Sequence, residues 1–270
     1  MWVIWHSPRA WCLRVRCYNS GVYRNLLEES RRKLLGLVEG VADITLILSW
    51  GNVGDQLIYA GLRQLLAQVD YREVQARNWS GAEGRMALLT GGGSWCRPWH
   101  EMPKVLAAAE ERFEKVIVLP SSYDTSVPTV RAALRRSKAL FFAREEASLA
   151  QIRDLCRADL ALDTSFFFDY GPYRGRASGV LNAFRNDAER AGSGPQVAGN
   201  RDISAECENL DQWLWAISRK EVIRTDRAHV MIAGALLGKR VEYRPSSYHK
   251  VPGIARYALR GFPVTEIAPG

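Results

Sequence analysis

Short apolar runs alternate with helix-like segments along residues 43–168, with only a few residues between neighbours. Runs of β-branched and leucine residues are typical of buried strands, whereas apolar residues that recur every three or four positions are typical of helices. This alternation predicts a parallel sheet covered by helices on both faces. We expect strands at 43–50, 71–76, 85–94, 115–122 and 138–144, and helices at 51–69, 102–113, 127–137 and 145–156.

A second, smaller unit follows the segment "DYGPYRGRASG" (169–179), whose Gly, Arg and Tyr content is typical of a linker. We expect strands at 179–187, 221–225 and 239–245, helices at 207–220, 226–238 and 247–261, and a polar loop at 188–202. The predicted fold class is α/β with two Rossmann-like lobes, residues 1–170 and 171–270. Parallel sheets bind ligands beyond the carboxyl ends of their strands, so we expect the site in a crevice between the lobes.

The charge balance of the 270-residue chain is basic, with 37 Lys and Arg against 29 Asp and Glu. An excess of this kind suits phosphorylated small molecules, an anionic membrane surface or nucleic acid. The basic residues are spread along the chain and form no Lys/Arg tract, so we expect no nucleic-acid partner. The five cysteines include no C-x-x-C pair, which argues against a zinc site or a disulfide framework and fits reduced thiols in the cytoplasm.

The first twenty residues are apolar but are interrupted by Pro8 and by Arg and His side chains. This composition does not match a secretory signal peptide, and nothing in the chain approaches the ~20 apolar residues of a membrane-spanning helix. The Trp and Arg content suits association with a membrane surface. Packing of this segment onto the fold is the alternative.

Two glycine-rich turns follow predicted strands in the first unit. In "SWGNVGDQLI" (49–58), Asn52 and Asp55 lie where the strand turns into a helix. A carboxylate in the first helical turn interacts favourably with the helix dipole, so Asp55 is interpreted as a helix cap or as a group that binds a sugar hydroxyl or accepts its proton. In "TGGGSW" (90–95), Gly92 and Gly93 fit either a tightly packed loop or close approach of the backbone to a ligand.

Arginine and histidine also gather at strand ends. Arg144 ends the predicted strand 138–144, where its guanidinium could bind a phosphate or carboxylate or pair with a neighbouring Glu. Arg227 and His229 begin the helix 226–238, which Asp226 is expected to cap. The helix dipole opposes a cation there, so helix stability does not explain either residue, whereas an anion bound between them would.

The segment "RPSSYHK" (244–250) follows the strand 239–245 and precedes the last helix. Ser247 and Lys250 are predicted to form a second phosphate pocket there, with His249 as an accessory to it or to the acceptor. A capped helix start with a solvated lysine is the alternative.

Five segments in this order, "GNVGDQLI", "TGGGS", "AREEAS", "TDRAHVMIAGALLGK" and "SSYHK", resemble the polysaccharide pyruvyl transferase family. The resemblance implies two α/β lobes like those of B-type glycosyltransferases, and transfer from phosphoenolpyruvate to two sugar hydroxyls to give a pyruvate ketal. It implies that Arg144, Arg227 and His229 contact phosphoenolpyruvate. Ala228 stands where the family more often has a bulky apolar residue.

The residues are consistent with this chemistry. His229 is predicted to be the general acid, Arg227 to hold the anion and Asp55 or Asp226 to accept a hydroxyl proton. The donor site comprises Arg144, Arg227, His229, Ser247 and Lys250, and the acceptor site comprises Asn52, Asp55, Gly92, Gly93 and His249. We expect no metal and no cofactor, and an acceptor that is a sugar or a lipid-linked oligosaccharide at the inner face of the membrane. The alternatives are a glycosyltransferase that uses a nucleotide sugar and a non-catalytic sugar-binding scaffold.

Overall fold

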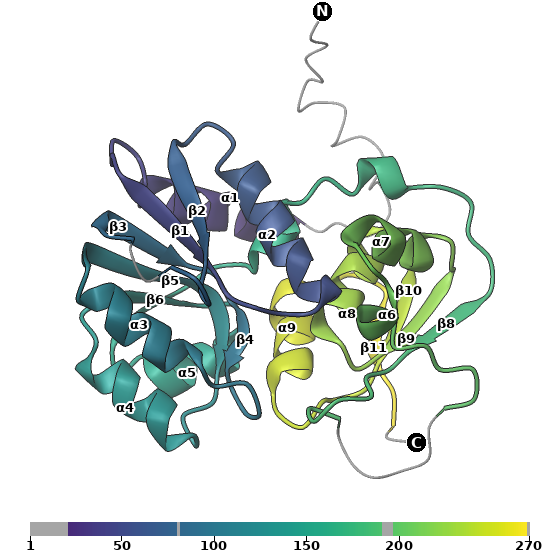
Figure 1. The fold of residues 1–270 in the computed structure, drawn as a ribbon. Coiled ribbons are helices and arrows are strands. Elements are labelled where there is room, and N and C mark those ends of the chain that lie inside the picture. The colour runs from purple at the N-terminus through teal and green to yellow at the C-terminus, as the bar shows by residue number, and fades with distance from the viewer. Residues whose placement is uncertain (1–20, 80–81, 191–196, 269–270) are drawn as a thin grey trace, which may run out of the picture.

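The strands of the computed structural model, which describes residues 21–79, 82–190 and 197–268, form two separate parallel sheets (Figure 1). The first sheet has the order β2-β1-β3-β5-β6-β7, and β4 pairs with β5. Its strands are β1 (Ile44–Leu48), β2 (Tyr71–Gln75), β3 (Gly84–Leu89), β4 (Gly92–Trp95), β5 (Phe113–Tyr123), β6 (Leu140–Ala143) and β7 (Arg157–Leu160).

The second sheet has the order β11-β10-β9-β8, and its pairs are parallel as well. Its strands are β8 (Val180–Ala183), β9 (Val222–Thr225), β10 (Arg240–Tyr243) and β11 (Val264–Glu266). Parallel strands joined by helices are the Rossmann-like α/β arrangement, so the predicted fold class is confirmed.

Helices cover both faces of the first sheet. The helical elements are α1 (Gly21–Gly36), α2 (Val53–Leu65), α3 (Met102–Glu110), α4 (Pro128–Arg136), α5 (Glu146–Ile152), α6 (Ile203–Glu206), α7 (Leu210–Ser218), α8 (Ala228–Leu236), α9 (Lys250–Ala258) and the 3-10 turns η2 (Thr164–Phe167) and η3 (Gly171–Tyr173). Leu46 and its neighbours on one face of β1 pack with α1 and α2, whereas Ile47 packs on the other face with α3 and α4. Strand residues alternate between faces, so both faces are apolar.

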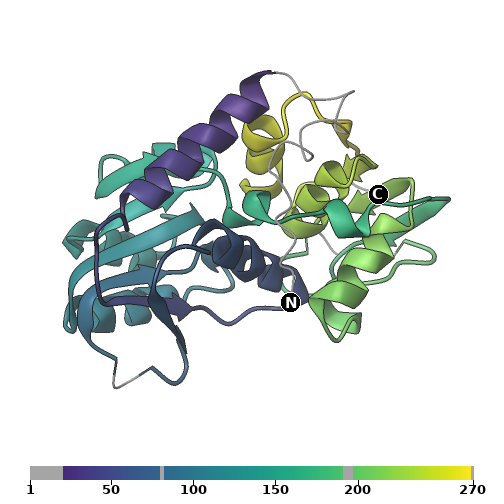
Figure 2. The same cartoon turned by 90° about the horizontal axis from the view of Figure 1, so that it is seen from above.

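One apolar core runs through both halves of the protein. The cluster that contains Leu46 and Leu57 from the first half also contains Val230 and Val241 from the second. Helix α1 lies along the first sheet and reaches the end of α9 (Figure 2), where Tyr23 and Phe262 meet edge to face at 5.1 Å. The two sheets are separate, but their shared core does not mark a boundary, so the division into residues 1–170 and 171–270 stays a prediction.

Several elements differ from the sequence prediction. The expected strand at 85–94 is two strands, because Gly91 crosses so close to β5 that an added Cβ would lie 1.9 Å from the Pro120 carbonyl oxygen. The segment 158–168 contains the turn η2 after β7, and helix α1 and strand β11 were not predicted. The first twenty residues, for which a membrane-surface or packed segment is expected, lie outside the described residues.

A helix with the length and apolar character to cross a membrane is not found in the part of the chain that the structure describes.

Candidate active site

A cavity of about 400 Å³ opens between the two halves, at the carboxyl ends of strands from both sheets. Small-molecule sites have volumes of ~300–1,000 Å³, so the cavity can hold ligands of modest size. Of the predicted residues, seven line it: Asn52, Asp55, Gly93, Arg144, Arg227, His229 and Lys250. Residues that were predicted from five separate segments of the chain therefore meet at one place.

The start of α2 holds Asp55 in place. Asn52 Oδ1 accepts a hydrogen bond from the Gly54 backbone N–H at 2.8 Å, and Asp55 Oδ2 accepts one from the Asn52 N–H at 2.9 Å. A Cβ on Gly51 would lie 2.4 Å from Asp55 Oδ2, so this capping arrangement needs glycine there. Asp55 is thus a capping residue, and its second oxygen faces His229 in the cavity. The capping interpretation of Asp55 is confirmed, and its role toward a sugar hydroxyl stays a prediction.

His229 lies between two carboxylates. Its Nδ1 is 3.3 Å from Asp55 Oδ1, and its Nε2 is 3.6 Å from Asp163 Oδ2. Helix α8 is buried at every residue, which fixes the backbone that carries the ring. Burial alone would lower the pKa of His229, but hydrogen bonds and negative charge from Asp163 and Asp55 outweigh it, so the pKa is raised above its ordinary value. The two carboxylates therefore shift the imidazole toward its protonated form, although Arg144 Nη1 also lies 3.4 Å from Nε2.

Asp163 is a site residue that the sequence interpretation missed. It follows β7, caps η2 by accepting from the Ser165 N–H at 2.9 Å, and receives Arg144 Nη1 at 2.7 Å. Although burial raises its pKa, His229 and Arg144 lower it below the ordinary value. Its position just after a strand, in "ALDTS", was the available signal, because Arg144 was identified by the same criterion.

Arg144, which is 1% exposed, also donates to Ser122 Oγ at 2.8 Å, so it is held rigidly.

Arg227 is buried at the start of α8, where the sequence interpretation placed it in the first turn of the helix beside a capping Asp226. Arg227 is itself the N-cap residue, and its Nη2 contacts Asp187 at 2.9 Å and Asp202 at 2.6 Å. Asp226 instead accepts a hydrogen bond from the Arg185 N–H at 2.8 Å, so its predicted capping role is wrong. The sequence interpretation, which used the helix dipole, expected a bound anion beside Arg227. It did not identify Asp187 and Asp202, because these carboxylates come from loops distant in sequence.

Lys250 completes an ionic network on the same side of the cavity. Its Nζ lies 2.6 Å from Glu189 Oε2, and Arg185 contacts both Glu189 and Asp187. Burial and the positive charges of Arg185 and Arg144 lower the pKa of Lys250 well below its ordinary value. Lys250 is 7% exposed, so the alternative of a solvated lysine at the helix start is wrong.

Three predicted residues are not among the described residues that line the cavity: Gly92, Ser247 and His249. His249 Nε2 lies 3.0 Å from Ser148 Oγ and thereby ties α9 to α5. The backbone N–H of Ser247 donates to the Glu189 carbonyl oxygen at 3.2 Å. Gly92 has φ of 120° and packs against Ile58. Each of these contacts supports the cavity walls from behind.

Some buried polar atoms at the cavity have no hydrogen-bond partner within the described protein, among them Arg227 Nε and Asp202 Oδ1. An unsatisfied buried donor or acceptor is costly, so it points to a ligand or solvent partner. The unsatisfied donor Arg227 Nε and the unsatisfied acceptor Asp202 Oδ1 suit a polar ligand.

Residues 52–241 match the family model described as "Polysaccharide pyruvyl transferase", which covers more than half of the chain. The chain belongs to the polysaccharide pyruvyl transferase family. This membership supports a transferase that places a pyruvyl group on a polysaccharide. The matched range includes Asp55, Arg144, Asp163 and His229 and ends before Lys250.

A solved structure shares the fold of this pyruvyl transferase family member. A functionally uncharacterised protein from Klebsiella pneumoniae subsp. pneumoniae NTUH-K2044 is 21% identical, with a TM-score of 0.73 over 90% of this chain and 99% of that chain. Identity at this level supports the fold alone. The chain matches no curated protein.

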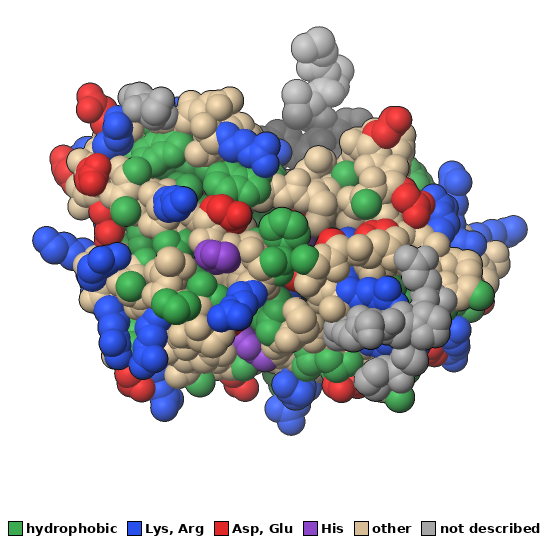
Figure 3. All heavy atoms as spheres, turned by 60° about the horizontal axis from the view of Figure 1, so that its bottom comes forward, with side chains coloured by type: hydrophobic (Ala, Val, Ile, Leu, Met, Phe, Trp, Pro, Cys, Tyr) green, Lys and Arg blue, Asp and Glu red, His purple; other side chains and the backbone are tan. Residues whose placement is uncertain are grey.

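The surface does not gather positive charge at one place on the face shown in Figure 3, where Lys and Arg side chains lie over both halves with acidic residues among them. The groups of His, Cys, Asp and Glu within the described ranges include none arranged to hold a metal ion.

Proposed function

We propose that the chain transfers a pyruvyl group from phosphoenolpyruvate to two hydroxyls of one sugar, forming a pyruvate ketal on a polysaccharide or on its lipid-linked precursor. Family membership supports the group that is transferred. The observation that carries the proposal is His229, which is held between Asp55 and Asp163 in a cavity whose described lining holds four Arg or Lys and four Asp or Glu side chains.

The donor suits the cationic side chains of the cavity. Phosphoenolpyruvate carries a phosphate and a carboxylate, and of the described cationic side chains four line the cavity: Arg144, Arg185, Arg227 and Lys250. Guanidinium groups bind both kinds of oxygen through paired N–H donors. The unsatisfied Arg227 Nε is the donor that a ligand oxygen could meet without displacing an ion pair of the protein.

The proposed reaction begins with His229. The imidazolium gives its proton to the methylene carbon of phosphoenolpyruvate, which becomes a methyl group and leaves an oxocarbenium-like carbon beside it. One sugar hydroxyl adds to that carbon, phosphate leaves with its electron pair, and a second hydroxyl of the same sugar closes the ketal. The two hydroxyl protons go to His229 and to phosphate, so protons balance.

Asp55 is suited to return one of these protons. While His229 is charged, the pKa of Asp55 is lowered, because hydrogen bonding and charge from His229 outweigh the effect of burial. Once His229 has given up its proton, this effect disappears and Asp55 becomes more basic. Asp55 can then accept a hydroxyl proton and pass it to His229 Nδ1, 3.3 Å away.

The lobes are further proposed to resemble those of B-type glycosyltransferases, and the protein to act in the cytoplasm at the inner face of the membrane. The free thiols of Cys96, Cys156 and Cys207 are compatible with a reducing compartment. Fractionation of cells that express the chain tests the location: recovery outside the cytoplasm and its membrane would contradict it.

The test compares ligands and variants. Phosphoenolpyruvate should raise the melting temperature, and the shift should grow with the logarithm of its concentration above Kd, whereas a panel of nucleotide sugars should cause no shift. His229→Gln keeps a polar side chain without the titratable proton, so it should retain this shift and lose ketal formation by roughly 10²–10⁴-fold. His249→Gln, which lies outside the cavity lining, is the control and should keep transfer. A shift with nucleotide sugars alone would favour a glycosyltransferase instead.

A further inference from the structure

The two walls of the cavity differ in chemistry. The side that belongs to the second sheet is ionic, and its charged residues are Arg185, Asp187, Glu189, Asp202, Arg227 and Lys250. The side that follows β1 and β4 of the first sheet carries two indole rings, Trp50 and Trp99, beside the uncharged Asn52 and Ser94. Asp55 and His229 lie between them. The cavity therefore has an ionic side, where three cations pair with three carboxylates, and an aromatic side.

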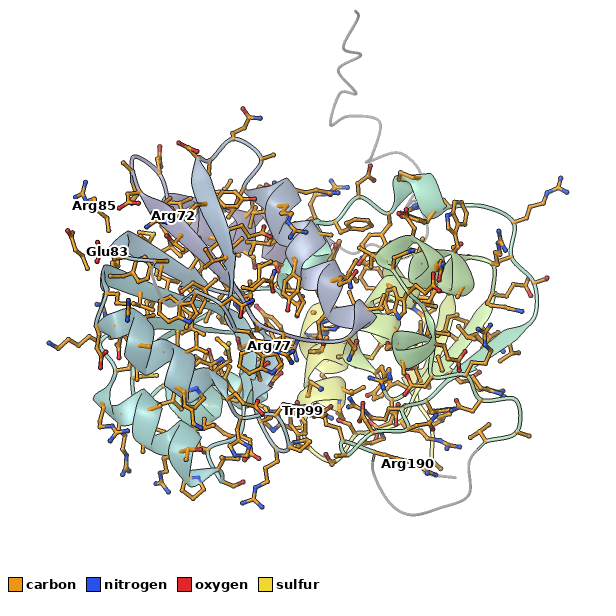
Figure 4. All side chains as sticks on the ribbon, in the orientation of Figure 1. Arg72, Arg77, Glu83, Arg85, Trp99 and Arg190 are labelled. Carbon is orange, nitrogen blue, oxygen red and sulfur yellow. The ribbon has the colours of Figure 1, made fainter. Side chains whose placement is uncertain are left out.

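Trp99 is 43% exposed, and it is one of four large hydrophobic side chains exposed among the described residues. The other three, Val22, Val180 and Trp215, do not line the cavity. Trp99 belongs to neither apolar core cluster, so burial on folding does not account for this ring. Figure 4 shows Trp99 between the two halves, away from Arg72, Glu83 and Arg85 at the far end of the first sheet.

Trp50 is partly buried and packs on the cluster that lies under α3 and α4. The guanidinium carbon of Arg77 lies 5.4 Å from the centroid of its ring, a cation–π contact that fixes the indole. A ring fixed in this way is preorganised to receive a ligand without losing side-chain entropy on binding.

The aromatic side does not suit the anionic donor, because the face of an indole carries negative charge and repels a phosphate or carboxylate. It suits a flat, uncharged ligand with C–H groups on one face. A pyranose ring has such a face, and its hydroxyls point outward from the ring edge toward polar partners such as Asn52 and Asp55.

We propose that Trp99 and Trp50 form the acceptor subsite, which binds the apolar face of a pyranose ring and directs its hydroxyls toward Asp55 and His229. This inference rests on the proposed function for the role of the bound sugar as acceptor. The sugar then lies on the side of the first sheet, the donor lies on the ionic side, and the ketal forms between them.

The experiment measures sugar binding without the donor. Saturation-transfer difference NMR with methyl hexopyranosides of the galacto, gluco and manno series should show transfer to the C–H protons of one ring face. Trp99→Ala should weaken binding by roughly 2- to 12-fold, the range for loss of one aromatic contact, whereas Trp99→Phe should keep most of it. Trp50→Ala should weaken binding as well.

Trp215→Ala is the matched control, since Trp215 is 41% exposed on α7 and packs with Tyr173 and Arg219 outside the cavity. Equal binding in Trp99→Ala and wild type, equal loss in Trp215→Ala, or no transfer to any glycoside would each overturn the inference. Melting temperatures confirm that each variant folds. Stabilisation by phosphoenolpyruvate is measured separately, so failure of the donor assignment and failure of the acceptor subsite are distinguishable.

Discussion

His229 shows how individual residues set the protonation state of the site. Its pKa is raised by Asp163 and Asp55 against the opposing effect of burial. A histidine whose pKa is higher in the folded than in the unfolded state stabilises the fold fully below the unfolded value of about 6.5. That contribution is lost as the pH rises through the folded pKa.

The difference in melting temperature between wild type and His229→Gln should therefore be largest below about pH 6.5 and should shrink as the pH rises through the folded pKa of His229. Asp163→Asn removes one of the two carboxylates that raise the pKa of His229. In an Asp163→Asn background, the difference in melting temperature between His229 and His229→Gln should therefore begin to shrink at lower pH. Differential scanning fluorimetry across a pH series measures both. A difference that stays constant or grows with pH would show that the imidazole is not held protonated by these carboxylates.

Arg227 carries a second prediction at this scale. Arg227→Ala leaves the buried Asp202 without its cation, whereas Asp187 keeps its contact with Arg185; breaking a buried pair in this way costs about 3–5 kcal/mol. Arg201→Ala is the control, because Arg201 and Glu206 form a pair at 2.9 Å that is largely exposed, worth roughly 0–1 kcal/mol. Urea denaturation measures both, and equal losses in the two variants would contradict a structural role for Arg227.

Individual residues were predictable from the sequence where the strand-end criterion applied, as for Arg144 and His229. The same criterion pointed to Asp163, which was overlooked. Asp187 ends the predicted strand 179–187, so the criterion pointed to it as well. Asp202 could not have been found in this way, because it lies in a predicted polar loop whose course is set by tertiary contacts. Trp99 lies in the loop after β4, and its exposure in the cavity is visible only in three dimensions.

Among the elements, α2 depends on close packing against η2. A Cβ on Gly61 would lie 2.0 Å from the Thr164 carbonyl oxygen, so the helix can approach only because glycine is there. Thr164 follows Asp163 directly, and α2 begins with the cap that holds Asp55. The spacing between the two carboxylates that flank His229 is thus set by this helix contact.

Gly61→Ala should destabilise the protein by about 1–3 kcal/mol, the usual cost of overpacking, and should also lower transfer by displacing Asp55. Gly36→Ala at the end of α1 is the matched control, since an added Cβ there meets nothing within 4 Å. It should be neutral or slightly stabilising, because alanine is favoured over glycine in helices by up to ~1 kcal/mol. Chemical denaturation compares the two, and a Gly61→Ala variant as stable as Gly36→Ala would contradict the packing argument.

Most elements of the fold were predictable because strand and helix differ in hydrophobic period. The strand at 85–94 was not resolved into two, since the steric requirement at Gly91 comes from β5 and leaves no local signal. Strand β11 is only three residues long, too short for a periodic pattern. Helix α1 precedes the first predicted strand in a region where no strand–helix alternation guided the interpretation.

At the scale of the whole molecule, two sheets and one shared core bring residues from both halves of the protein together around one cavity. Sequence alternation predicted both halves. It did not predict that α1 would join them, because contacts between Tyr23 and Phe262 span nearly the whole chain.

The position of α1 has a consequence for synthesis. Its apolar face buries Tyr23, Leu27 and Leu34, and Tyr23 rests on Phe262. At ~5–20 residues per second, the ribosome produces Phe262 roughly 10–50 s after Tyr23. During that interval the helix cannot complete its docking, and part of its apolar stripe is open to whatever is nearby. The nascent chain therefore presents its first helix to chaperones, or to aggregation, until translation has almost reached the end of the sequence.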